Sequence, residues 1–266
     1  MVLLVIVRRY HRVRTDEFCT AAPSTRAGTQ QGVSTNTVKA GSTVLQETPH
    51  MVLFTNNGKV RASTAEEARQ THNASAGDPA GVATAQALGD LSHLVYAPAE
   101  NWTGELMFID QWVSAEGIQR FFADAHVQEG GAALFTSYDP VVWLPADGFH
   151  AYHIAAPLGQ SDRIVAMLRG TVTSLDAARA AMNGAWQPRI LAAHRQGLQS
   201  HEMFARLAAP GTPEALEILG VDTWSGPGGM GTVYDDPAFM QALYGVFTGQ
   251  PKTWRLRRPA GDWVEW

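Results

Sequence analysis

The sequence is poor in cysteine, in charge and in long apolar runs. Cys19 is the single cysteine, so the chain cannot form a disulfide framework by itself, and this scarcity is typical of a reducing compartment. No apolar run approaches the ~20 residues that a membrane-spanning helix needs, so we expect a cytoplasmic protein with no membrane partner. The net charge is −5 and there is no basic stripe, which argues against a nucleic-acid partner.

Residues 1–47 lack the periodic apolar face of a packed segment. Beyond a short basic cluster they are mostly Ser, Thr, Gly, Ala and Gln, so we predict a disordered tail. The remaining length fits two small domains, and the 45% of hydrophobic residues in the chain suffices for packed cores. We place these domains at residues 48–157 and 158–266.

The most informative feature that is present is an internal repeat. A set of residues between positions 63 and 143 returns in the same order between 173 and 254, at offsets of 108 to 112. The matched residues include Arg69 and Arg179, Asn73 and Asn183, His93 and His201, Asp110 and Asp222, Trp112 and Trp224, and Phe135 and Phe247. We therefore expect two copies of one small domain, packed as a pseudo-dimer.

Both copies show the same order of expected elements. In the second copy, apolar runs predict strands over 163–168, 199–207, 215–224 and 252–257, and helical spacing follows Ser174 and Asp236. In the first copy, strands are predicted from Met51 and over 91–97, 105–112 and 141–144, with helices after Thr64 and Asp124. This β-α-β-β-α-β order is that of a ferredoxin-like unit. We predict an α+β fold of two tandem ferredoxin-like repeats, whose sheets face each other and enclose a cavity.

The element order resembles that of the dimeric α+β barrel superfamily, which includes antibiotic-biosynthesis monooxygenase-like proteins. A Trp that closes the third strand ahead of a polar segment, as in Asp110-Gln111-Trp112-Val113-Ser114, adds to the resemblance, which covers residues 50–266. It implies an intramolecular dimeric α+β barrel. The superfamily includes cofactor-free oxygenases that act on polycyclic phenols and quinols, haem-degrading enzymes and isomerases. The haem-degrading branch pairs a Trp with a His around its second helix, whereas this region holds Phe121, Phe122 and His126.

The repeated His and Asp are the candidate catalytic residues. One hairpin register places His93 opposite Asp110 and His201 opposite Asp222, although the two loops differ in length. A carboxylate that holds an imidazole fixes its tautomer and raises its basicity, as a general base requires. The alternative is a structural pair that locks each hairpin, and the presence of the pair in both copies favours that alternative.

Four further repeated residues are candidates for substrate binding. Trp112 and Trp224 share a strand face with the Asp two residues earlier, so they could form an aromatic wall, although core packing explains them as well. Asn73 and Asn183 lie at matching positions of the first helices, where the polar face of a helix is the alternative explanation.

Two other motifs predict no cofactor or metal. Residues 226–231, Gly-Pro-Gly-Gly-Met-Gly, match a dinucleotide-binding pattern, but they align with part of 113–122 in the first copy, so we interpret them as a flexible rim over the cavity. His150 and His153 lie between the copies without a further close ligand. We expect neither a cofactor nor a metal.

The sequence leaves two functions open. The first is a cofactor-independent oxygenase, or a related proton-transfer enzyme, that acts on an aromatic or quinone-like small molecule in the barrel cavity. Such a substrate, once deprotonated, can pass an electron to oxygen itself. The second is a non-catalytic barrel that binds an apolar metabolite or mediates association with other protein chains, including copies of itself in a homo-oligomer. A His–Asp pair that faces an open pocket favours the enzyme, and one that faces the helices favours a structural role.

Overall fold

A computed structural model describes residues 51–153, 163–208 and 216–266, and the predicted tail lies outside this part of the chain. The first repeat contains β1 (Val52–Val60), α1 (Ala65–Ser75), α2 (Pro79–Ala87), β2 (Asp90–Pro98), β3 (Glu105–Trp112), α3 (Ala115–Phe122), α4 (Ala125–Leu134) and β4 (Phe135–Pro145), followed by β5 (Tyr152–His153). The second repeat contains β6 (Ile164–Thr171), α5 (Leu175–Trp186), α6 (Ile190–Arg195), β7 (Leu198–Arg206), β8 (Glu217–Trp224), α7 (Pro227–Tyr234), α8 (Pro237–Tyr244) and β9 (Lys252–Arg257).

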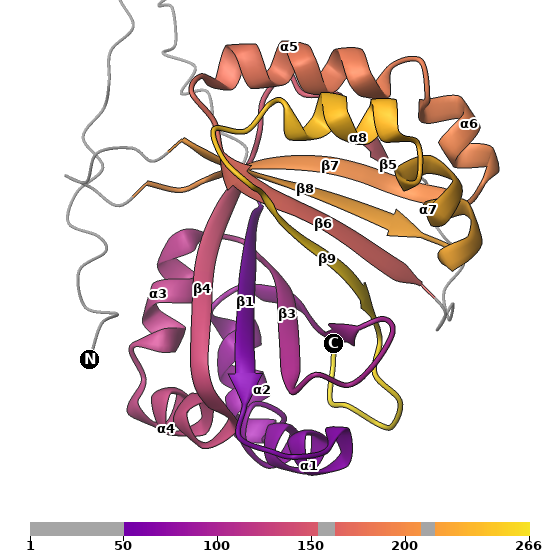
Figure 1. Cartoon of the computed structure of the whole chain (residues 1–266). Helices are drawn as coiled ribbons and strands as arrows, with labels where there is room; N and C mark the ends of the chain where they lie inside the picture. Colours follow the sequence, from indigo (N-terminus) through magenta and orange to yellow (C-terminus); the bar gives the residue numbers. More distant parts are fainter. Residues whose placement is uncertain (1–50, 154–162, 209–215) are drawn as a thin grey trace, which may run out of the picture.

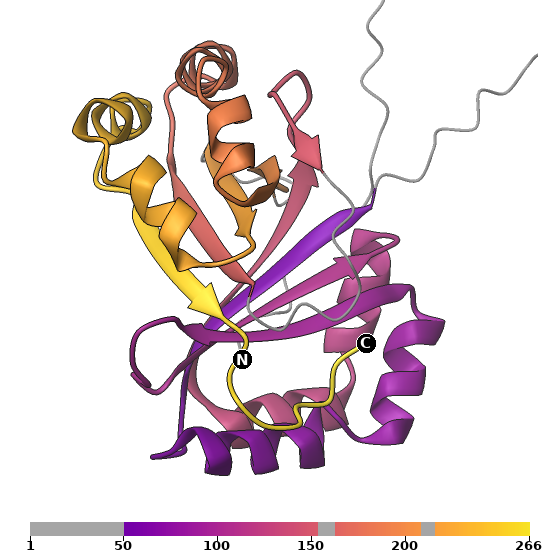
Figure 2. The same cartoon turned by 90° about the vertical axis from the view of Figure 1, so that its right-hand side faces the viewer.

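The strands form a closed antiparallel barrel (Figure 1). Neighbouring strands follow the order β4-β1-β3-β2-β9-β6-β8-β7, and β4 also pairs with β7, which closes the ring. Each half has the strand order of a ferredoxin-like unit, so the predicted barrel of two tandem repeats is confirmed. Helices α1 to α4 cover the outer face of the first half-barrel and α5 to α8 that of the second (Figures 1 and 2).

The helices begin where polar caps predicted them. Thr64, Asp124, Ser174 and Asp236 each accept a hydrogen bond from a backbone N–H of the first helical turn. Where one helix per connection was expected, each connection holds two. Within the described residues, every helix is too short or too polar to cross a membrane.

The predicted cavity inside the barrel is limited to one end, because the centre of the barrel is packed. Strand alternation turns apolar side chains of both repeats into the interior, where they pack against one another. This cluster includes Leu53, Met107, Ile109, Trp143, Val165, Met167, Leu219, Val221 and Leu256. The centre of the barrel is therefore a packed core that joins the two repeats, and a substrate site has to lie at one end of the barrel or outside it.

The glycine-rich segment that was interpreted as a flexible rim is instead helix α7. A Cβ at Gly229 would overlap the backbone carbonyl of Gln196, and a Cβ at the matching Gly117 of α3 would overlap that of Leu88. The two glycines therefore allow α3 and α7 to approach the chain that precedes β2 and β7. Close packing, and not flexibility or nucleotide binding, explains why glycine occurs at these matched positions.

Candidate functional site

The two His–Asp pairs lie where the predicted register places them. His93 is opposite Asp110 across β2 and β3, with 2.8 Å between His93 Nδ1 and Asp110 Oδ1. His201 is opposite Asp222 across β7 and β8, with 2.5 Å between the corresponding atoms. All four side chains are buried. The cross-strand pairing is confirmed in both repeats, while a catalytic role remains a prediction.

Both pairs face the helices and not the barrel interior, which is the orientation that favours a structural role, but the first pair also lines a cavity. On β3, Ile109 belongs to the packed core inside the barrel, so its neighbour Asp110 points to the outer face. Trp112 shares that outer face, as predicted, and packs in the cluster under α3 that contains Phe54 and Ile118. Trp224 occupies the matching position in the core of the second repeat.

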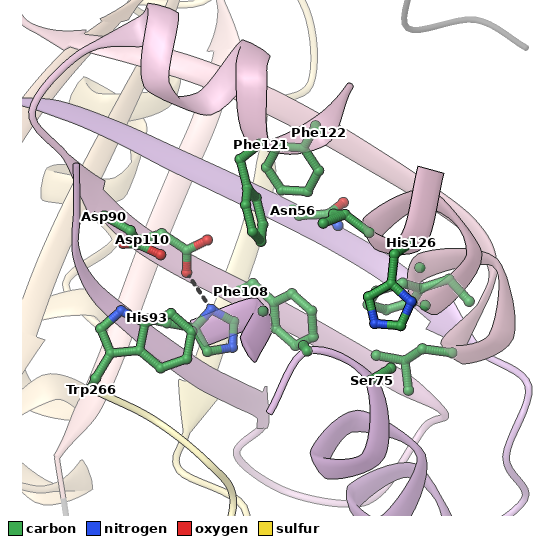
Figure 3. Close-up of a pocket in the computed structure, with 17 residues that line it drawn as sticks. Asn56, Ser75, Asp90, His93, Phe108, Asp110, Phe121, Phe122, His126 and Trp266 are labelled. Atoms are coloured by element: carbon green, nitrogen blue, oxygen red, sulfur yellow. Dashed lines mark hydrogen bonds and ion pairs between the residues drawn. The ribbon is translucent and has the colours of Figure 1, made fainter. Parts of the chain in front are cut away.

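The first repeat encloses a cavity of about 90 Å³ between its sheet and its helices. Aromatic side chains form much of the wall, namely Phe108, Phe121, Phe122, Phe135 and Trp266. The polar side chains in the lining are Asn56, Ser75, Asp90, His93, Asp110 and His126. Figure 3 shows Asp90, Asp110 and His93 gathered on one side, with Asn56 and His126 toward the other. Trp112 does not line the cavity but supports its wall, because its ring packs against Phe121 with centroids 5.6 Å apart.

Asp90 is a buried carboxyl group of this site that sequence reasoning missed. A register shift between Asp90 and Ser92 places Asp90 and His93 on one face, although residues three apart in a regular strand point to opposite faces. Burial and the charge of Asp110 raise the pKa of Asp90 to about 7. Asp90 can therefore exchange a proton near neutral pH, which is the property expected of a catalytic acid or base.

His72 is a second functional candidate that sequence reasoning missed. It projects from α1, is fully buried, and places its Nε2 atom 3.0 Å from Nε2 of His93. Its Nδ1 atom lies 3.0 Å from Oδ1 of Asn73. Burial and the neighbouring His93 lower the pKa of His72 to about 4, so this ring is neutral at pH 7. Both ring nitrogens of His93 thus have partners, and His93 cannot itself contact a substrate through a ring nitrogen in this arrangement.

The second repeat is packed at the corresponding place. Trp186, three residues after Asn183, lies over His201 with ring centroids 4.4 Å apart. The matching position in the first repeat, three residues after Asn73, is Ala76, which lines the cavity. Met182 occupies the position of His72 on the helix, and Leu198 occupies the position of Asp90 in the strand register, so two polar residues of the first repeat are apolar in the second. A lone aspartate or histidine gives no sequence signal, but this comparison between the copies could have identified both.

Asn73 and Asn183 hold two exchanged segments, which we name the first strap (residues 146–153) and the second strap (residues 258–266). Each strap follows the last strand of one repeat and packs on the other repeat, as the yellow C-terminal trace shows for the second strap (Figure 2). Asn183 Nδ2 donates to the Gly148 carbonyl at 3.0 Å, and Asn183 Oδ1 accepts from the His150 N–H at 2.7 Å. Neither Asn lines the cavity, so the proposed contact with substrate would require rearrangement.

The second strap fixes Asn73 in the same way. Asn73 Nδ2 donates to the Asp262 carbonyl at 2.8 Å, while Asn73 Oδ1 accepts from the Val264 N–H at 3.0 Å. Trp266, further along the strap, stacks on His93 with ring centroids 4.8 Å apart and closes one side of the cavity. The second repeat therefore contributes part of the wall of the site in the first repeat.

A larger cavity, of about 150 Å³, opens at one end of the barrel. Its lining is mostly apolar and includes Leu53, Gln111, Glu202 and Phe204. Burial raises the pKa of Glu202. Neither His–Asp pair lines this cavity, so the smaller cavity of the first repeat combines more groups that can transfer protons. Among the described residues, His, Cys, Asp and Glu side chains form no group of three that could hold a metal ion.

The fold is a dimeric α+β barrel formed within one chain, as the sequence resemblance predicted. The superposition with an anthrone oxidase-like protein covers 80% of this chain and 92% of that protein, at 16% identity and a TM-score of 0.57. A monooxygenase candidate from Lactobacillus acidophilus matches 78% of this chain with 93% of its own, at 10% identity and a TM-score of 0.51. One from Fusobacterium nucleatum matches 78% with 92% of its own, at 7% identity and a TM-score of 0.51. No protein-family model and no curated protein matches the sequence. At these identities the likeness shows the fold alone.

Proposed function

We propose that the chain is a cofactor-independent oxygenase, or a related proton-transfer enzyme, whose site is the cavity of the first repeat. The observation that carries this proposal is the contrast between the repeats. At matched positions, one repeat keeps a cavity with a buried carboxyl group beside a His–Asp pair, whereas the other fills the space with Trp186. A purely structural role for both His–Asp pairs does not explain why one copy is open and polar while the other is packed.

The cavity favours a small hydroxylated aromatic ligand. Its walls are largely aromatic rings, which suit a flat apolar molecule. Its volume of about 90 Å³ is below the ~150 Å³ of an apolar cavity that admits benzene, so the ligand has at most one ring, and the side chains at the entrance adjust to admit it. Asn56 Oδ1 is buried without a hydrogen-bond partner among the described residues, so it is ready to accept a hydrogen bond from a ligand hydroxyl.

Asp90 is the proton acceptor in this proposal. Both ring nitrogens of His93 are engaged by Asp110 and His72, so the imidazole supports the carboxyl groups and does not act as the base itself. The ionised carboxylate of Asp90 takes the phenolic proton, and the phenolate passes an electron to O₂. The aryloxyl radical and superoxide combine to a peroxide anion, which takes the proton back from Asp90, and the resulting hydroperoxide loses water. A phenol and O₂ thereby become a quinone and H₂O, with O₂ as the oxidant.

Oxygen uptake with a panel of one-ring phenols and hydroquinones tests this proposal. We expect wild-type protein to consume O₂ and form the quinone, and Asp90→Asn to lower kcat by at least about 100-fold, the usual range for loss of a general base. Asp235→Asn makes the same chemical change at an exposed site and should keep wild-type activity. Ligands that stabilise the protein without turnover would support the non-catalytic binding alternative instead.

A further inference from the structure

The hydrogen bonds around His93 form a chain. The groups at its two ends determine how many protons the chain must contain. The chain runs from Asn73 Oδ1 to His72, then to His93, and ends at Asp110 Oδ1, with contacts of 3.0, 3.0 and 2.8 Å. At one end, a carboxylate accepts hydrogen bonds. At the other end, the second strap fixes the orientation of the Asn73 amide, because its nitrogen must donate to the Asp262 carbonyl and its oxygen must accept from Val264.

A chain between two acceptors needs a proton for every contact. Because Asn73 Oδ1 only accepts, His72 Nδ1 must carry a hydrogen. A neutral His72 then has a bare Nε2, so the hydrogen in the second contact belongs to His93 Nε2. The third contact needs a further hydrogen on His93 Nδ1, which donates to Asp110. If Asp110 is a carboxylate, both nitrogens of His93 must carry a hydrogen, because two neutral rings would supply two hydrogens for three contacts.

The hydrogen bonds of Asp222 in the second repeat require only one proton on the His201 ring. His201 Nδ1–H donates to Asp222 Oδ1, and the Tyr234 hydroxyl donates to Asp222 Oδ2. A neutral His201 satisfies this arrangement. The residue that would correspond to His72 is Met182, whose thioether is at most a weak acceptor for a ring N–H. The same His–Asp motif thus has different proton requirements in the two halves of the chain.

We propose that His72 is a positioning residue that holds His93 doubly protonated, so that the first repeat stores a proton and the second does not. The protonation of His93 is independent of the proposed function, and only its effect on a bound phenolate rests on that function. The stored positive charge offsets the charge of Asp110 beside the cavity. A phenolate that forms there, as its proton moves to Asp90, then adds a negative charge to a site that is closer to neutral.

The other charged groups around His93 are consistent with this count. Asp110 reaches it from β3, Asp90 from β2 and His72 from α1, and His126 of α4 lies at the rim of the same cavity. From the second strap, Glu265 accepts from the Val95 N–H at 2.7 Å and forms an ion pair with Arg258. Two carboxyl groups thus lie beside the His93 ring, and the carboxylate of the strap has its own cation.

Long-range ¹H–¹⁵N NMR spectra of the full chain, labelled in its histidine rings, measure the proton count directly. At pH 7 we expect both His93 nitrogens to show the protonated pattern and His201 to show a neutral ring with its hydrogen on Nδ1. His93→Asn and His201→Asn assign the two signals. His72→Met, which installs the residue of the second repeat, should replace the doubly protonated His93 pattern at pH 7 by that of a singly protonated ring, because an acceptor of a charge-assisted hydrogen bond is lost.

His72→Gln is the conservative partner variant. Its side-chain carbonyl can still accept from His93 Nε2, so it should restore the protonated pattern that His72→Met loses. The His201 signals report in every sample whether the rest of the fold is intact. A single proton on the wild-type His93 ring at pH 7, or an unchanged pattern in folded His72→Met, would overturn the inference. The spectra need no substrate, so a protein without oxygenase activity but with an imidazolium at His93 would contradict only the proposed function.

Discussion

The indole of Trp186 packs against the imidazole of His201, with ring centroids 4.4 Å apart, at the place where the first repeat has Ala76. One pair of matched residues therefore separates a closed half from an open one. Ala76 lines the cavity of about 90 Å³, whereas Trp186 is 2% exposed and belongs to the core of the second repeat. The asymmetry gives the site hypothesis a direct test, since each residue can be exchanged for its counterpart.

Ala76→Trp should fill the cavity of the first repeat. Phenol at millimolar concentration should raise the Tm of the wild-type protein, because a ligand that binds only the folded state stabilises it. In the variant, this shift should disappear and any oxygen uptake should fall by at least about tenfold. Differential scanning fluorimetry with and without phenol measures the shift. A phenol effect equal to that of the wild type would mean that the ligand binds elsewhere.

Trp186→Ala is the matched control in the other repeat. It removes a buried indole from a packed core and should cost about 3–5 kcal/mol of unfolding free energy, measured by urea titration. It leaves the first cavity unchanged, so oxygen uptake per folded molecule should persist. Loss of activity in this variant at temperatures where it is folded would place the site in the second repeat.

Asp90 should make stability depend on pH. Its folded pKa of about 7 lies above the ordinary 3.8, so the fold favours the protonated form, and the contribution is present below about pH 4 and is lost as pH rises through 7. Asp90→Asn mimics the protonated form, so its stability relative to wild type should increase by roughly 2–4 kcal/mol between pH 4 and pH 8. Urea unfolding at several pH values measures this difference. Parallel curves for the two proteins would show that Asp90 ionises normally.

His72 should have the opposite effect on the pH dependence of stability, over nearly the same pH range. Its folded pKa of about 4 lies below the ordinary 6.5, so protonation favours the unfolded chain, and stability should rise as pH increases from 4 to 6.5. The two effects oppose each other in the wild-type protein. His72→Gln should remove the rising part alone, and the urea series for this variant should then fall more steeply with pH than that of the wild type.

How far the site could be predicted depended on whether its residues left a repeated pattern. The His93–Asp110 and His201–Asp222 pairs were predictable because two hairpins of different loop length give the same register. The place of Asp90 in the site was not predictable, because its orientation depends on a β-bulge that leaves no periodic pattern in the sequence. His72 was not, because a single histidine on a helix gives no information about the strand that it faces.

The extent of the cavity inside the barrel was mispredicted for a similar reason. Two facing sheets predict a barrel, but whether its interior is open depends on side-chain volumes that meet across both repeats, such as those of Trp143, Met167 and Leu256. The role of Asn73 and Asn183 depended on straps that cross from the opposite repeat, and no local pattern indicates where such a segment ends. The helix order and caps were local, and they were largely predicted.

Two pairs of glycines should respond oppositely to alanine. A Cβ at Gly117 or Gly229 would overlap a backbone carbonyl, so Gly117→Ala and Gly229→Ala should destabilise the protein by at least about 2 kcal/mol. Gly131 of α4 and Gly184 of α5 have open space where a Cβ would lie, so alanine there should stabilise by about 0.5–1 kcal/mol through its helix propensity. Thermal unfolding distinguishes the pairs, and destabilisation of similar size at all four positions would contradict the close approach.

Asn73→Ala and Asn183→Ala should weaken the two straps equally but affect the site unequally. Each substitution removes two hydrogen bonds between a helix and a strap, so each should cost about 1–3 kcal/mol of unfolding free energy. Asn73→Ala also releases the strap that carries Trp266 over His93 and removes the acceptor that faces His72. Oxygen uptake and the phenol-induced Tm shift should therefore fall by about tenfold in Asn73→Ala and remain in Asn183→Ala. Equal losses of activity in both variants would mean that strap packing acts only through global stability, and the second repeat would then have no specific part in the site.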